Sequence, residues 1–115
     1  MVKLTVMFRR APEMTPEAFL AHWRDVHVPL VAQIPGIVRY TISPTLLAPD
    51  EPRPVFDGMA SLYFRTTADL EAALASEETA ATAVDGRNFI ERGTIKRLIS
   101  EEYEVVDARA ADTPI

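Results

Sequence analysis

The sequence predicts a domain of the α+β class, in which a strand–helix–strand unit occurs twice. Four segments alternate or run apolar in the manner of β-strands: residues 3–8, 37–42, 59–65 and 95–106. Between them, helix start signals at Thr15 and Thr66 are each followed by apolar residues at helical spacing. With 115 residues, 48% of them hydrophobic, the chain fits one domain with a substantial core.

The first strand, residues 3–8, places its apolar side chains on one face. After a short connector, Thr15 can cap a helix whose first position is Pro16, where the fixed backbone angle of proline is favourable. Apolar side chains then recur at the three-and-four spacing of one helix face: Phe19, Trp23, Val26, Leu30 and Ile34.

His27 is the unusual member of this helix, because its imidazole lies inside the apolar stripe, one turn from Trp23. Pro29 removes one backbone donor, so we expect a kink or a broken turn at residues 26–29, beside His27. The Pro-Gly pair at residues 35–36 then ends the helix.

The next segments predict a pair of strands joined by a long loop. Residues 37–42 alternate as a strand that carries Tyr40. Four prolines between residues 43 and 57 predict an extended loop without regular structure, and loops of this length are often lids or contact sites. Residues 59–65 form a third strand that is rich in aromatic side chains.

A second helix is expected to start at Thr66 or Thr67, with Asp69 placed for a capping box. It runs through an alanine-rich segment to the Asp-Gly pair at residues 85–86, and residues 87–92 add one more helical turn.

The last strand, residues 95–106, completes the second strand–helix–strand unit. This order gives a four-stranded antiparallel sheet with both helices on one face, the ferredoxin-like βαββαβ arrangement. The strands carry bulky residues on both faces, so a second copy of the chain is the natural cover for the open face. We expect the domain to span residues 1–106, with residues 107–115 as a frayed tail.

The composition narrows the class of partner. The formal net charge is −5 and the basic residues are scattered, so neither nucleic acid nor an anionic membrane is expected as a partner. The chain has no cysteine, which excludes disulfides and thiolate chemistry. The amino-terminal apolar run is too short for a signal peptide or a membrane span, so we expect a cytoplasmic protein.

The chain resembles the EthD family, which belongs to the dimeric α/β-barrel superfamily of ferredoxin-like domains. The motifs that carry the resemblance are Trp23-x-x-x-His27-x-Pro29-Leu30, Ile34-Pro35-Gly36, Arg39-Tyr40, Phe56-Asp57-Gly58, Tyr63-Phe64, and Asp85 with Phe89. Their order covers most of the chain, from Lys3 to about Val105. The resemblance implies a homodimer in which two sheets pack face to face.

His27 and Tyr40 are the candidate catalytic residues. The pKa of histidine is near ~6.5, so partial burial can tune His27 toward acid–base catalysis, and family members with an activity have a histidine at this motif position in the pocket. The alternative is a structural histidine that bonds a backbone carbonyl freed by Pro29. Tyr40 can donate a hydrogen bond to a substrate carbonyl or phenolate, or be a core residue with its hydroxyl at the edge.

Six further residues are candidates for substrate binding: Trp23, Arg39, Phe56, Asp57, Tyr63 and Phe89. The aromatic ones can line an apolar pocket for a flat ligand, or simply fill the core. Asp57 can orient His27 or a ligand, although an Asp-Gly turn explains it equally well. Arg39 can pair with an acidic ligand or lie solvated at the surface.

Several chemistries are not expected. His22 is expected at the exposed rim of the helix. It lies five residues from His27, so the two are not expected to share a helix face as zinc-binding histidines at i and i+4 do. No glycine-rich loop or Gly-x-Ser-x-Gly elbow occurs. We therefore expect no metal, no nucleotide and no other cofactor.

Two functions from different classes remain. The first is a small cofactor-independent enzyme, an isomerase, lyase, cyclase or oxygenase, that acts on a hydrophobic, aromatic, lactone or polyketide-like substrate by proton transfer at His27. The second is a non-catalytic small-molecule-binding or accessory protein of a degradative pathway. A haem-binding protein is a third reading, because barrels related to this family bind haem through a histidine.

Overall fold

The computed structural model describes residues 1–46 and 53–109. Its elements are β1 (Val2–Phe8), α1 (Pro16–His22), a π-helical turn (Trp23–His27), α2 (Val28–Val31), β2 (Arg39–Pro44), β3 (Gly58–Phe64), α3 (Thr67–Leu74), α4 (Glu77–Gly86) and β4 (Lys96–Glu101). This order confirms the predicted α+β class. No helix among the described residues is long and apolar enough to cross a membrane.

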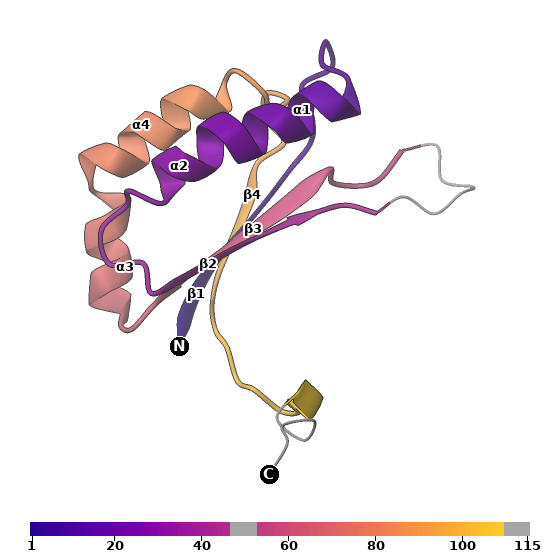
Figure 1. Cartoon of the computed structure of the whole chain (residues 1–115). Helices are drawn as coiled ribbons and strands as arrows, with labels where there is room; N and C mark the ends of the chain where they lie inside the picture. The colour runs from indigo at the N-terminus through magenta and orange to yellow at the C-terminus, as the bar shows by residue number, and fades with distance from the viewer. Residues whose placement is uncertain (47–52, 110–115) are drawn as a thin grey trace.

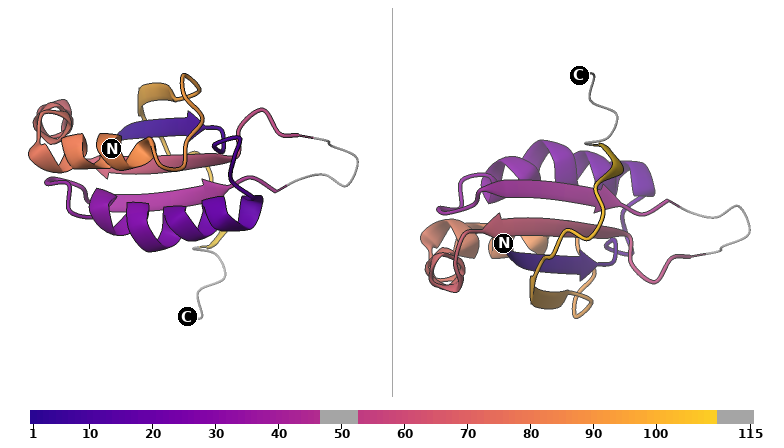
Figure 2. Two further views of the ribbon diagram at one scale, coloured as in Figure 1. Left: turned by 90° about the horizontal axis from the view of Figure 1, so that it is seen from above. Right: turned by 90° about the horizontal axis from the view of Figure 1, so that it is seen from below.

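The strands form one antiparallel sheet in the order β2-β3-β1-β4. The helices all lie on one side of it, as Figure 1 shows, and in the view from below in Figure 2 the strands lie in front of the helices. The predicted ferredoxin-like arrangement is therefore confirmed. One face of the sheet is covered by helices, and the other face is open.

The register of the sheet assigns each strand residue to a face. Tyr40, Leu62, Leu4 and Ile99 form one row across the helix-covered face. The open face is more polar than expected, because Thr5, Ser61 and Thr41 lie on it between its larger side chains, which are Met7, Met59, Tyr63 and Leu98.

An aromatic cluster holds the helices on the sheet. Trp23 and Phe89 are fully buried. The ring of Phe8, at the end of β1, meets both edge-on, with centroids 5.0 Å from Trp23 and 5.9 Å from Phe89. Phe19 completes the cluster at 6.1 Å from Phe8. Edge-to-face pairs of this kind add about 0.5–1.5 kcal/mol each beyond the burial of their area.

The first helix starts as predicted, since the hydroxyl of Thr15 accepts a hydrogen bond from Ala18 N at 3.1 Å. The predicted irregularity is confirmed as well, but it begins earlier and takes the form of a π-helical turn. There, Val28 N donates to the carbonyl of Trp23, five residues back. Pro29 follows directly and cannot donate, so the chain regains α-helical geometry only in α2.

The second helix was predicted as one element, but it is divided into α3 and α4. The hydroxyl of Ser76 accepts from Thr79 N at 3.2 Å and caps a new helix, whose first turn contains Glu77 and Glu78. A serine followed by acidic residues is a helix start signal, and here it outweighs the helix propensity of the flanking alanines.

The last strand was predicted to reach residue 106, but β4 ends at Glu101. Its partner, β1, begins at Val2, which lies opposite Glu101, and the last backbone bond joins Glu102 N to Met1 O at 3.0 Å. Residues 87–92 do not form a helical turn in full, because Ile90 already pairs with Arg10 in an isolated bridge. Parts of the predicted loop and tail, residues 47–52 and 110–115, lie outside the described residues.

Gly58 allows the Trp23 ring to lie against the start of β3. A Cβ atom at this position would come within 2.5 Å of two indole carbons. We therefore expect Gly58→Ala to lower the free energy of unfolding by about 1–3 kcal/mol, since the indole would have to leave its packed position against Phe8 and Phe19. Urea denaturation measures the change.

Gly86→Ala is the matched control. A Cβ atom at Gly86 meets only the Cδ1 atom of Ile90, at an ordinary 3.6 Å. Because Gly86 is helical, alanine there should be neutral or stabilising by up to about 1 kcal/mol. Equal stability of Gly58→Ala and the wild type would contradict this account of the packing.

Candidate active site

A cavity of about 160 Å³ lies between the sheet and the helices. Most of its wall is apolar and comes from β1, β3 and the helices. The polar side chains in its lining are Trp23, His27, Tyr40, Thr79, Thr82 and Arg97. An apolar cavity with a few polar groups has the usual character of a small-molecule site.

Asp85, on α4, holds the histidine that lines this cavity. Its Oδ2 atom lies 2.9 Å from His27 Nδ1, and its Oδ1 atom lies 3.0 Å from His22 Nε2. The amide of Asn88 donates a third hydrogen bond to Oδ1, at 3.1 Å. The side chain of Asp85 is only 8% exposed, so these three donors replace the water that a carboxylate requires.

The π-helical turn brings His22 and His27 to the same carboxylate. The expectation that residues five apart would not share a face assumes α-helical geometry and is wrong here, because a π-turn spaces its backbone bonds by five residues. His22 is accordingly half-buried rather than exposed, with 21% of its side chain accessible. Both imidazoles also pack on Phe89, at ring distances of 5.0 Å and 4.7 Å.

The carboxylate sets the tautomer of His27. An ionised Asp85 can only accept hydrogen bonds, so Nδ1 of His27 carries the proton and Nε2 of the neutral ring is an acceptor. Burial lowers the pKa of His27 below its usual 6.5, against the opposing effect of Asp85. Burial alone would raise the pKa of Asp85, but the hydrogen bonds from His27, Asn88 and His22 leave it lowered. The pair is therefore a neutral imidazole beside an ionised carboxylate at neutral pH.

Two buried polar atoms near His27 have no hydrogen-bond partner among the described residues. They are Nε1 of Trp23 and the hydroxyl of Tyr40, and both residues line the cavity. Burial raises the pKa of Tyr40 to about 12, while the neighbouring Trp23 opposes the rise, so the phenol stays protonated. A buried donor without a partner costs about 1–3 kcal/mol, and a ligand oxygen would recover this cost.

The structure brings together four of the predicted site residues and separates the others from them. Trp23, His27 and Tyr40 line the cavity, and Phe89 supports the imidazole. Tyr63 and Arg39 lie on the open face, where the guanidinium of Arg39 covers the Tyr63 ring at 4.9 Å. The Tyr63 hydroxyl donates to Glu102 at 2.9 Å. Phe56 borders a different hollow, beside Met7 and Met59.

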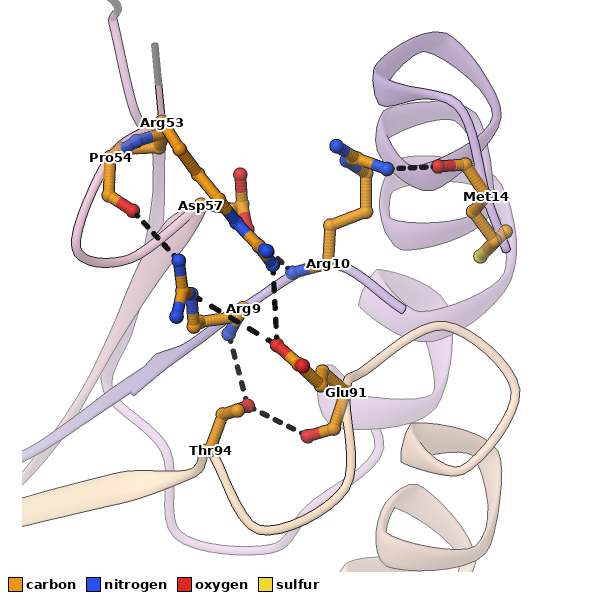
Figure 3. Close-up of polar contacts among 8 residues, drawn as sticks. All are labelled: Arg9, Arg10, Met14, Arg53, Pro54, Asp57, Glu91 and Thr94. Atoms are coloured by element: carbon orange, nitrogen blue, oxygen red, sulfur yellow. Dashed lines mark hydrogen bonds and ion pairs between the residues drawn. The ribbon is translucent and has the colours of Figure 1, made fainter. Parts of the chain in front are cut away.

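Asp57 has a structural partner rather than His27. Its Oδ2 atom accepts a hydrogen bond from Arg10 N at 2.7 Å, and its own N–H donates to Phe8 O at 2.9 Å. Figure 3 shows Asp57 among the contacts that join the end of β1 to the segment before β3, where Glu91 also meets the Arg53 guanidinium. The carboxylate that orients His27 is Asp85 instead.

Sequence reasoning singled out His27, but it named Asp85 only as a motif residue and did not predict that Asp85 bonds His27, His22 and Asn88. One signal for Asp85 was available. A carboxylate in the last turn of a helix interacts unfavourably with the helix dipole, so an aspartate there requires hydrogen-bond donors from another element.

The described residues contain no group of three or more ligating side chains arranged to hold a metal ion.

Comparisons with known proteins agree with this architecture. A sequence model described as the EthD domain matches residues 11–93. An uncharacterised 11.0 kDa protein from the thcB-thcC intergenic region of Rhodococcus erythropolis is 31% identical over 102 residues, which are 89% of this chain and 96% of that protein.

Solved structures show the same fold. An ethyl tert-butyl ether D (EthD) family protein from Bacillus halodurans is 27% identical, with a TM-score of 0.75 over 90% of this chain and 99% of that one. SnoaB, a cofactor-independent oxygenase from Streptomyces nogalater, is 17% identical, with a TM-score of 0.63 over 91% and 95%. A dimeric ferredoxin-like protein from Thermobifida fusca is 15% identical, with a TM-score of 0.66 over 86% and 88%.

The lowered pKa of His27 predicts how stability depends on pH. Below about pH 6.5 the unfolded chain binds a proton at this residue more readily than the folded protein does. The free energy of unfolding therefore decreases as the pH is lowered. Above pH 6.5 both states carry a neutral imidazole, and this contribution is constant. Below pH 3.8, protonation of Asp85 in the unfolded chain continues the loss.

Urea denaturation between pH 8 and pH 5 measures the first part of this effect. His27→Asn should make the curve flatter below pH 6.5, since the titrating group is gone. A curve that keeps its slope in this variant would assign the dependence to other groups.

Proposed function

Since the chain belongs to the EthD family, we propose that it is a small cofactor-independent enzyme that moves a proton with His27. The substrate is a hydrophobic carbonyl compound with an aromatic, lactone or polyketide-like ring. One observation carries the proposal: an imidazole oriented by Asp85 lines an apolar cavity that also contains two buried donors with no partner among residues 1–46 and 53–109.

The first step uses the acceptor nitrogen of His27. Nε2 removes a proton from the carbon next to the substrate carbonyl. The electron pair of the broken C–H bond forms a C=C bond, and the π pair of the carbonyl moves onto its oxygen, which gives an enolate. The Tyr40 hydroxyl and the Trp23 indole N–H donate hydrogen bonds to this oxygen, where the negative charge develops.

The second step returns the proton. Asp85 stabilises the imidazolium through the bond to Nδ1. Where a C=C bond of the substrate is conjugated with the enolate, the imidazolium gives the proton from Nε2 to the far carbon of that bond, and the double bond shifts, which isomerises the substrate. If the neighbouring carbon carries a leaving group, the bond to that group breaks and the imidazolium gives it the proton from Nε2, which completes an elimination instead. Both outcomes leave His27 neutral and ready for the next cycle.

The second candidate function is non-catalytic binding of a small hydrophobic molecule. The observation that favours it is that the contact with Asp85 already satisfies one nitrogen of His27, as a structural role would require. The indole and phenol donors would then fix the orientation of a bound carbonyl compound without any reaction.

His27→Asn separates the two functions. The substrate can be sought by mass spectrometry of molecules that co-purify with the protein, and α-proton exchange in D₂O gives a direct readout of proton removal. If His27 is the base, the variant should lose about 10²–10⁴-fold in turnover while it stays folded.

His22→Asn is the matched control. His22 also contacts Asp85, but it is not in the lining of the cavity, so its replacement should leave most of the turnover intact. Full turnover in folded His27→Asn protein would remove His27 from the mechanism and leave the binding function.

We also propose that two copies pair through the open face of the sheet. The large side chains on this face, Met7, Met59 and Leu98, are not covered by helices, and Leu98 is 57% exposed. The dimeric protein from Thermobifida fusca, which has the same fold, supports the proposal.

Light scattering at micromolar concentration should give twice the mass of the chain. The Leu98→Glu variant should shift the protein toward monomer, because it places a charge in the interface, whereas Val84→Glu on exposed α4 should not. A wild-type monomer at this concentration would refute the dimer.

A further inference from the structure

We propose that Arg97 makes this site selective for single-ring carbonyl compounds that carry a carboxylate or a similar anionic group. The inference rests on the proposed function. His27 and Tyr40 would hold the carbonyl end of the ligand, and Arg97 would bind its other end. It follows from the position of Arg97, from its lack of an acidic partner among the residues that the structure describes and from the size of the cavity.

Arg97 lies on the helix-covered face of β4, opposite Val6, and lines the cavity. Its neighbours on the same face, Ile95 and Ile99, are 43% and 54% exposed, so the helices leave this edge of the sheet largely uncovered. Arg97 therefore stands where the cavity meets solvent. The buried polar groups, His27 Nε2, Trp23 Nε1 and the Tyr40 hydroxyl, lie deeper in the same cavity.

The guanidinium of Arg97 is available for a ligand. Among the described residues, no carboxylate lies within ion-pair distance of it, whereas the arginines at positions 9, 53 and 109 each meet an acidic side chain. The planar fork of an arginine matches a carboxylate through two parallel hydrogen bonds.

The dimensions fit one ring. A cavity of about 160 Å³ is comparable to the engineered cavity of roughly 150 Å³ that binds benzene. Tyr40 and Arg97 lie on opposite edge strands of the four-stranded sheet, three strand spacings apart and offset by two residues along the strands, so they are roughly 16 Å apart. Both side chains are long and reach into this gap, so a single ring with a carbonyl at one end and an acidic group at the other can contact both.

Two commercially available probes test the inference. 4-Acetylbenzoate carries a ketone and a carboxylate on one ring, and acetophenone is the same ketone without the acid. Trp23 is the only tryptophan of the chain and lines the cavity, so its fluorescence reports binding at this site. We expect 4-acetylbenzoate to bind about tenfold more tightly than acetophenone, with a preference that weakens at high salt.

Arg97→Gln should remove this preference and leave the affinity for acetophenone unchanged, and Arg97→Lys should keep part of it. Arg65→Gln is the control, because it removes the same charge from an exposed position after β3. Equal binding of 4-acetylbenzoate by the wild type and Arg97→Gln would overturn the role of Arg97 and leave the proposed function standing. Failure of both probes to change the Trp23 fluorescence would count against both.

Discussion

The buried carboxylate of Asp85 needs hydrogen-bond donors from the protein itself, and the arrangement of the helices supplies them. The carboxylate lies on α4. Two of its hydrogen-bond donors are His22 and His27, at the two ends of the π-helical turn, and the third is Asn88. A buried carboxylate that lost these donors would cost several kcal/mol or become protonated. These hydrogen bonds therefore fix how the first helical segment lies against α4.

The same contacts give the cavity its chemical character. The bond to Asp85 uses Nδ1 of His27 and leaves Nε2 for a ligand. The ring of Phe89 packs against the imidazoles of His22 and His27. Close by, Trp23 contributes its ring to the core, while its N–H has no partner in the described part of the chain. The helix–sheet interface thus serves stability and retains polar groups that a ligand can satisfy.

The two faces of the sheet have different roles. The helix-covered face supplies apolar wall to the cavity and ends in Arg97 at its edge. The open face carries polar residues between its larger ones, and there Tyr63 is covered by Arg39 and bonded to Glu102. Arg39 and Tyr63 therefore belong to a surface that is separate from the cavity, although they are next to Tyr40 in sequence or in the sheet.

The sequence by itself determined the order of the elements, the strand faces, the Thr15 cap and the presence of an irregular turn near His27, because periodicity, capping and proline act over a few residues. Only the tertiary structure decided where β4 ends, since a strand needs a partner, and which carboxylate meets His27. Pro29 indicates an irregular turn, but the contact between His27 and Asp85 also depends on how two helices pack across 58 residues, and this packing has no local signal in the sequence.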